Sequence, residues 1–218
     1  MDNRLIDKNY KTPIGIVNCG LTSNKALIES MDKKSYKNGQ SEIYKSSDFE
    51  IEVIQFKIRL PLYNGGTLTD SNGWIWRIIR KQNNSEKIQL DCKLIDTIDN
   101  IDYDVACGEH LDAIEVSNTD WILHIGTEDG EAMNSRAQIN NWFPNRLLNK
   151  REFYISFTEM KKDGFITKIP DLKIDERLHL QYICAYDKRS NDPENVNTWL
   201  AVDEFKDKLE NWIGIDNE

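Results

Sequence analysis

The sequence lacks every short motif that would define a reaction. There is no GxxxxGK[ST] phosphate loop and no GxGxxG, which excludes the common nucleotide-binding cradles. There is no GxSxG nucleophile turn. The three histidines show no HxH or HExxH spacing of the kind that binds zinc. Any function must therefore be argued from charge, composition and a few unusual segments.

Cysteine is scarce and long apolar runs are absent. The four cysteines, Cys19, Cys92, Cys107 and Cys184, form no CxxC pair, and buried free thiols in a reducing compartment explain them most simply. No run approaches the roughly 20 apolar residues that a membrane-spanning helix needs. The first residues contain no apolar signal segment. We therefore expect a cytoplasmic protein with reduced thiols, no membrane association and no cofactor.

Negative charge is concentrated in one part of the chain. The segment Glu86 to Glu131 contains thirteen Asp or Glu and only two Lys, a net charge of −11, while the whole chain carries −9. The remaining residues are therefore slightly basic. A concentrated negative field attracts cationic partners and repels nucleic acid. This charge distribution predicts a basic protein partner and no binding of nucleic acid.

Alternating apolar and polar residues dominate the chain and predict strands. The clearest is Phe49–Leu60, with a one-residue slip at Val53–Ile54 where we expect a β-bulge. Asn83–Ser85 is typical of a hairpin turn, as is Lys162–Gly164. Further strands are expected at 74–80, 87–94, 121–125, 153–158, 165–169, 178–186 and 198–202. Their spacing predicts a mainly β fold, antiparallel and sandwich-like.

The chain is long enough to bury about 70% of its unfolded surface. We expect a single β-rich domain over residues 1–218, with two β units divided near residues 96–118 as the alternative. The polar stretch 33–47 suits a linker or a mobile loop. Trp74 and Trp76 share one face of a strand, which favours the core over a stacking platform for sugars.

Few segments have a helical pattern. Ser23 or Asn24 could cap a short helix that continues through Met31. The strongest pattern lies at the C-terminus, where we expect Asp203 to cap a helix over residues 204–213 and Gly214 to end it. Its apolar stripe, which predicts packing on the sheet, consists of Phe205, Leu209, Trp212 and Ile213.

Asp96, Asp99, Asp102 and Asp104 place four carboxylates within nine residues. Such a segment could attract a basic surface or bind Ca²⁺ through several oxygens. An EF-hand is not indicated, because no Gly follows any of them at the sixth position of such a loop. A solvated loop is the alternative without function.

The segment Asn140–Arg146 has the most unusual composition. Trp142, Phe143 and Arg146 are residue types that dominate binding hot spots, and turn-forming residues flank them. We therefore include these three with the four aspartates as candidate partner-binding residues. The alternative is a loop that closes one end of the sandwich with its aromatic side chains buried.

His124, Glu128 and Asp129 are weak candidates for a metal site, and Glu128, Asp129 and Glu131 for paired catalytic carboxylates. A β-turn at 128–130 explains the same residues without function. A nucleophilic pair of Cys107 with His110 is conceivable, but no glycine-rich nucleophile turn surrounds Cys107. We expect no catalytic residues here.

The leading hypothesis is a non-enzymatic acidic protein that binds a basic protein partner, such as an immunity-like or other inhibitory protein in the bacterial cytoplasm. The alternative is a ligand-binding β-sandwich that recognises a sugar, a small molecule or Ca²⁺ through Trp142, Phe143 and the Asp96–Asp104 cluster. An enzyme is the third and least favoured class.

Overall fold

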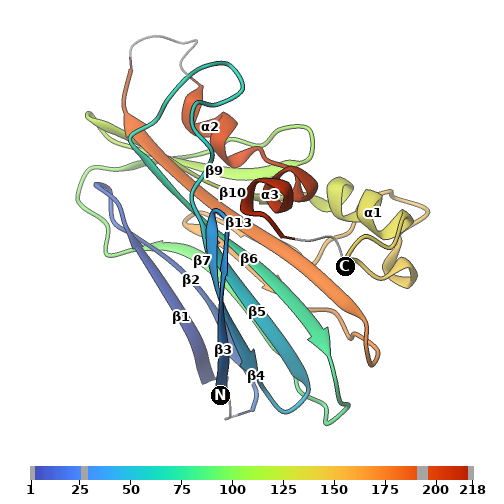
Figure 1. Cartoon of the computed structure of the whole chain (residues 1–218). Coiled ribbons are helices and arrows are strands. Elements are labelled where there is room, and N and C mark those ends of the chain that lie inside the picture. The colour runs from blue at the N-terminus through green and yellow to red at the C-terminus, as the bar shows by residue number, and fades with distance from the viewer. Residues whose placement is uncertain (1–2, 26–28, 191–195, 216–218) are drawn as a thin grey trace.

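The computed structural model describes residues 3–25, 29–190 and 196–215, and its strands form two antiparallel sheets (Figure 1). The five-stranded sheet has the order β1 (Asn3–Lys11), β2 (Ile16–Ser23), β7 (Ile88–Ile95), β12 (Gly164–Lys168) and β11 (Thr158–Lys161). The eight-stranded sheet has the order β3 (Glu29–Tyr36), β4 (Gly39–Lys45), β5 (Phe49–Phe56), β6 (Asp70–Arg80), β13 (Arg177–Lys188), β10 (Trp121–Glu128), β9 (Leu111–Ser117) and β8 (Asp102–Val105). Strands hold 48% of the residues and helices 13%, which confirms the mainly β, sandwich-like prediction.

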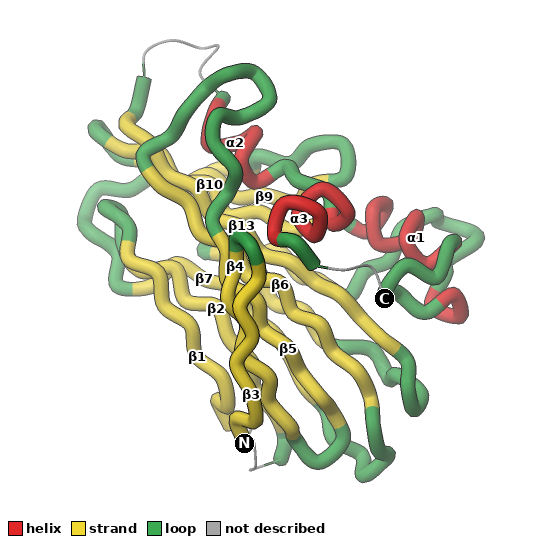
Figure 2. Tube along the Cα trace, viewed as in Figure 1, coloured by secondary structure: helices red, strands yellow, loops and turns green. Residues whose placement is uncertain are grey.

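Helices add a third layer on one side of the sheets (Figure 2). α2 (Asn197–Val202) and α3 (Lys206–Ile213) pack on the outer face of the eight-stranded sheet and enclose a second apolar core there. Trp74 and Trp76 face the five-stranded sheet and are fully buried, as expected, while Ile75 between them faces the helices. α1 (Gly130–Gln138) and a short 3₁₀ helix (Asn145–Leu147) complete the structure.

The slip in the pattern of β5 is not the β-bulge that the sequence predicts. β5 pairs with β4 and with β6 without any shift in register. Ile51 and Val53 pack in the core between the sheets, whereas Ile54 and Phe56 pack in the core under the helices. The apolar positions change face because a different layer covers each end of the strand.

Two predicted connections are wrong. Asn83–Ser85 joins β6 to β7, which lie in different sheets, so these residues form a crossover and not a hairpin turn. Residues 33–47, expected to be a linker or loop, fall mostly within the β3–β4 hairpin. The hairpin at Lys162–Gly164 is confirmed and joins β11 to β12.

Both sheets contain strands from before and after residues 96–118, so a division into two β units there would cut both sheets.

Other predicted elements also differ. Ser23 ends β2 and Glu29 begins β3, so the described part of the expected helix through Met31 is extended; residues 26–28 lie outside the described chain. Residues 198–202 form most of α2 and not the predicted strand. The prediction was wrong because three consecutive apolar residues, Leu200 to Val202, are buried, and such a run does not show the period of a helix. Of the residues 153–158 that were expected to form a strand, only Thr158 belongs to one, as the first residue of β11.

The helix predicted at the C-terminus is present but shorter. α3 begins at Lys206 with Phe205 in the N-cap position, so Asp203 is not its cap. Gly214 ends it at φ 84°, in the left-handed region that favours glycine, as expected. The predicted β-turn at 128–130 is also wrong, because the Asp129 side chain accepts hydrogen bonds from two backbone amides and caps α1.

Among the described residues, no helix combines the length and the apolar character that crossing a bilayer requires.

Candidate functional site

The four aspartates of the acidic segment, which we define as residues 96–104, lie on the connection between the two sheets and on the edge strand β8. The segment leads from the end of β7 into β8, the last strand of the eight-stranded sheet. Asp96, Asp99, Asp102 and Asp104 are all exposed, and none of them forms an ion pair with a described residue. Their charges therefore face solvent without compensation from this chain.

The acidic segment is held in place by neighbouring groups. The Ile98 amide donates a hydrogen bond of 3.0 Å to the Ile14 carbonyl oxygen. Tyr103 is partly buried and pairs with Val116 of β9, and the Lys162 ammonium lies 4.6 Å from its ring centre. No cluster of three or more His, Cys, Asp or Glu suited to a metal ion occurs in the described chain. The arrangement provides an ordered, negatively charged edge.

The aromatic candidates lie elsewhere and have separate roles. Phe143 is fully buried, stacked on Phe157 with ring centres 6.1 Å apart, so it belongs to the core and is not a surface contact. Trp142 is partly buried, and the guanidinium carbons of Arg77 and Arg177 lie 4.5 and 5.3 Å from its ring centre. Its backbone is left-handed, φ 48°, which is an outlier for a bulky residue.

Arg146 is engaged within the chain. Its guanidinium donates two hydrogen bonds of 2.6 Å to the carboxylate of Glu176, and this pairing raises the pKa of Arg146. Trp142 contacts β6 and β13 in the middle of the eight-stranded sheet, whereas the acidic segment lies at its β8 edge. The structure therefore does not combine these residues with the aspartates into one site.

The weak metal candidates are also separated by their partners. His124 is buried, with Nδ1 2.9 Å from the Thr198 hydroxyl and Nε2 3.4 Å from a Glu115 oxygen. The Glu128 carboxylate accepts a hydrogen bond of 2.6 Å from Arg136. Asp129 caps α1. Each group satisfies a structural neighbour, and the three do not converge on a common point.

Cys107 and His110 do not form a nucleophilic pair. The Cys107 thiol lies 3.7 Å from a carboxylate oxygen of Asp112, while the His110 ring lies 4.0 Å from Glu131 and 5.9 Å from the ring of Phe205. Burial, with a contribution from Asp112, raises the pKa of the Cys107 thiol. A raised pKa reduces the thiolate fraction, which is the opposite of what a nucleophilic cysteine needs.

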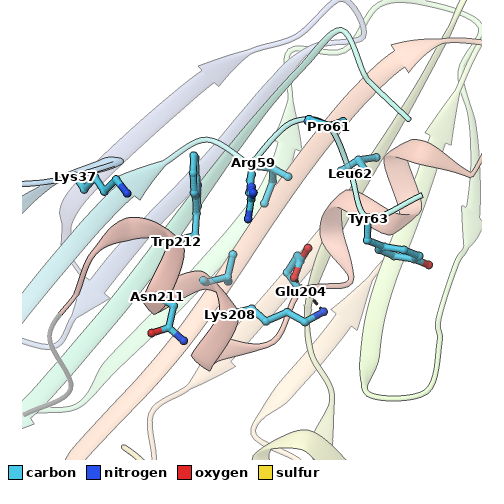
Figure 3. A pocket seen from close by; sticks show the side chains of 11 residues that line it. Lys37, Arg59, Pro61, Leu62, Tyr63, Glu204, Lys208, Asn211 and Trp212 are labelled. Carbon is cyan, nitrogen blue, oxygen red and sulfur yellow. Dashed lines mark ion pairs between the residues drawn. The ribbon is translucent and has the colours of Figure 1, made fainter. Parts of the chain in front are cut away.

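A groove between the 58–63 segment and α3 was not foreseen from the sequence (Figure 3). It encloses about 790 Å³ and lies beside the C-terminal helix. Its lining residues are Lys37, Ile58, Arg59, Pro61, Leu62, Tyr63, Glu204, Lys208, Leu209, Asn211 and Trp212. The two sides of the groove are about 145 residues apart in sequence, so no local pattern could reveal it.

The groove has an apolar floor and a charged rim. Ile58, Leu62 and Leu209 are nearly fully buried and belong to the core under the helices. In Figure 3 the Arg59 side chain stands beside the indole of Trp212, and its guanidinium carbon lies 5.9 Å from the ring centre. No family model matches this chain, and comparisons with curated proteins and with solved structures find no match either.

Proposed function

We propose that this protein is a non-enzymatic binding protein whose acidic segment engages a basic protein partner, in the manner of an immunity or other inhibitory protein. The observation that carries the proposal is the exposure of Asp96, Asp99, Asp102 and Asp104 without an ion-pair partner among the described residues. Four uncompensated carboxylates on one ordered edge repel each other, and a cationic surface relieves that repulsion.

Electrostatic attraction of this kind acts before contact. Complementary charges raise the rate of association more than the final affinity, and salt screens them over about 8 Å at physiological ionic strength. The exposed segment can therefore select basic partners from solution. Specificity would come from the contacts that form afterwards.

The position of β8 offers a means of direct contact. β8 is an edge strand that pairs only with β9, so one side of its backbone is free of strand partners in the described sheet. An extended segment of a partner could pair with such an edge, while its Lys or Arg side chains meet Asp102 and Asp104. Charges on an edge also discourage self-association through like-charge repulsion.

We favour binding over catalysis because the side chains suited to acid–base chemistry are engaged in structural contacts. Glu128 is paired with Arg136 at 2.6 Å, and Asp129 caps α1. His124 lies buried between Thr198 and Glu115. A catalytic carboxylate or imidazole would need to reach a substrate, and these groups face their own neighbours instead.

The proposal is tested with two matched charge variants. The first carries Asp96→Asn, Asp99→Asn, Asp102→Asn and Asp104→Asn; the control carries Glu29→Gln, Asp32→Asn, Glu152→Gln and Asp175→Asn, which are exposed outside the acidic segment. Association with an oligolysine peptide is measured at about 10 mM and about 150 mM salt. The two proteins and the parent are also immobilised and exposed to a bacterial extract, and the retained proteins are identified by mass spectrometry.

We expect the first variant to associate with oligolysine at least about tenfold more slowly at low salt, with a weaker salt dependence than the parent and the control. Its melting temperature should be unchanged or higher, since like-charge repulsion is reduced. Basic proteins should be retained by the parent and the control and lost from the variant. If both variants behave alike in rate and retention, the segment is only a solvated edge and the proposal is wrong.

A further inference from the structure

We propose that the groove between the 58–63 segment and α3 binds a small aromatic carboxylate. This site uses a different surface and a different class of ligand from the acidic segment, so it goes beyond the function proposed above. The groove volume of about 790 Å³ falls within the range of roughly 300–1,000 Å³ that is typical of small-molecule sites.

The walls of the groove suit a flat apolar body. Trp212 is partly buried on one side, and Tyr63 is 78% exposed at the end opposite Lys37 (Figure 3). Leu62 and Leu209, which are 6% and 3% exposed, also line the groove. An aromatic ring placed here would cover apolar surface and pack against the indole or phenol in the offset or edge-on geometry that aromatic pairs prefer.

The charges around the groove suit an anion. Lys37, Arg59 and Lys208 line it, and Glu204 is its one acidic lining residue. Lys208 lies 3.8 Å from Glu204, whereas neither Lys37 nor Arg59 forms an ion pair with any described residue. In a chain with a net charge of −9, an excess of cations at one groove is a local reversal of sign. A carboxylate would supply the missing counter-charge through charge-assisted hydrogen bonds.

The groove is formed before any ligand binds. The Trp212 indole Nε1 donates a hydrogen bond of 3.0 Å to the Lys57 carbonyl oxygen, which fixes the ring relative to the 58–63 segment. Two backbone hydrogen bonds close the turn after Leu62. The Leu62 amide donates to the Gly66 carbonyl oxygen at 2.9 Å, and the Gly65 amide donates to the Leu62 carbonyl oxygen at 2.8 Å. Pre-formed walls reduce the entropy lost when a ligand is bound.

The test separates the ring from the charge. Binding of 2-naphthoate, its neutral analogue 2-naphthamide and the non-aromatic anion cyclohexanecarboxylate is measured by calorimetry on the whole chain. The indole N–H resonance of Trp212, assigned by its loss in Trp212→Phe, reports whether the ligand occupies the groove. Lys37→Gln with Arg59→Gln removes the two rim cations that form no ion pair with a described residue, and Lys11→Gln with Arg151→Gln is the control with two exposed cations outside the groove lining.

We expect 2-naphthoate to bind with a Kd below about 1 mM and at least about tenfold more tightly than either analogue. Its preference over the amide should disappear in the Lys37→Gln, Arg59→Gln protein and persist in the control, with both proteins melting near the parent because these side chains are exposed. The proposal is overturned by an absence of saturable binding, by equal binding of carboxylate and amide, or by a preference that survives loss of the two rim cations.

Discussion

At the scale of single residues, the four cysteines show how surroundings decide chemistry. Cys19, Cys92 and Cys184 are fully buried in the core between the sheets, and Cys19 and Cys92 are opposite each other on β2 and β7. Burial raises the pKa of the Cys92 and Cys184 thiols. Cys107 is exposed, and all four thiols are free in the structure. The sequence predicted that the free thiols are buried, which is confirmed for Cys19, Cys92 and Cys184 and is wrong for Cys107.

We predict that one thiol reacts in the native protein and that four react after unfolding. Alkylation followed by mass spectrometry should locate the native modification on Cys107. Because burial and the Asp112 charge raise the pKa of this thiol, its reaction should accelerate with pH at higher values than for a free cysteine. Asp112→Asn should speed the reaction at neutral pH. A native protein with two or more reactive thiols, or with none, would contradict this prediction.

At the scale of elements, α3 shows what a helical stripe can and cannot predict. The sequence places Phe205, Leu209, Trp212 and Ile213 on one apolar face, yet only Leu209 and Ile213 are buried, and Phe205 is 45% exposed. The helix starts after Phe205, so this residue does not share the helical geometry of the others. Trp212 lies at the margin of the stripe and lines the groove.

A buried ion cluster also fixes the orientation of α3. Glu210 is 1% exposed, and its carboxylate accepts hydrogen bonds from Arg77 of β6 at 2.7 Å and from Lys206 at 2.5 Å. Burial opposes the charged form of Glu210, but the His179 imidazole of β13, with Nδ1 3.4 Å from a carboxylate oxygen, acts together with Lys206 and Arg77 to keep the pKa of Glu210 below its usual range. A polar residue on the buried side of a helix contradicts the simple apolar pattern, which is why the sequence did not predict this contact.

For α3 we predict that Leu209→Ala lowers the free energy of unfolding by about 2–5 kcal/mol, the range for large-to-small substitutions in a core. Phe205→Ala should lower it by less than about 1 kcal/mol, because much of that side chain is already in solvent. Chemical denaturation of the two variants measures the difference. Equal losses would show that α3 does not dock on the sheet through Leu209.

At the scale of the whole molecule, the two sheets are joined near their edges by polar contacts as well as by the core. Lys8 of β1 donates to Glu42 of β4 at 2.5 Å, and the Tyr44 hydroxyl donates to the same carboxylate. These hydrogen bonds, with Lys8 contributing most, lower the pKa of Glu42 from 4.5 to about 2. The pair thus connects the five-stranded sheet to the eight-stranded sheet.

This contact predicts a defined pH dependence. The folded state favours the charged form of the Glu42 carboxylate. The contribution of Glu42 to the free energy of unfolding is therefore complete above pH 4.5 and is lost as the pH falls towards about 2. Glu42→Gln should reduce the free energy of unfolding by about 1 kcal/mol at neutral pH, a modest value because the pair is partly solvated. The difference from the parent should shrink across that pH window. Glu29→Gln, at an exposed position of β3, is the control; a constant difference down to pH 2 would contradict the assignment.

The sequence by itself determined the features that depend on neighbouring residues. Alternation located β5 and β7, largely apolar runs located β6 and β13, glycine marked the β11–β12 turn and the end of α3, and the count of charges identified the acidic segment. These features follow from the repeat of side-chain direction along a strand or helix, or from the conformational preference of single residues such as glycine. They can therefore be predicted without knowledge of the tertiary structure. The exposure of the four aspartates was expected from the same local composition.

Only the tertiary structure decided what depends on residues far apart in the chain. It placed β6 beside β13 and β7 in the other sheet, covered the second face of the eight-stranded sheet with helices, and separated Trp142 from the acidic segment. It also formed the groove from the 58–63 segment and α3. Such contacts reflect which surfaces exclude water together over the whole molecule, and no local pattern carries that information.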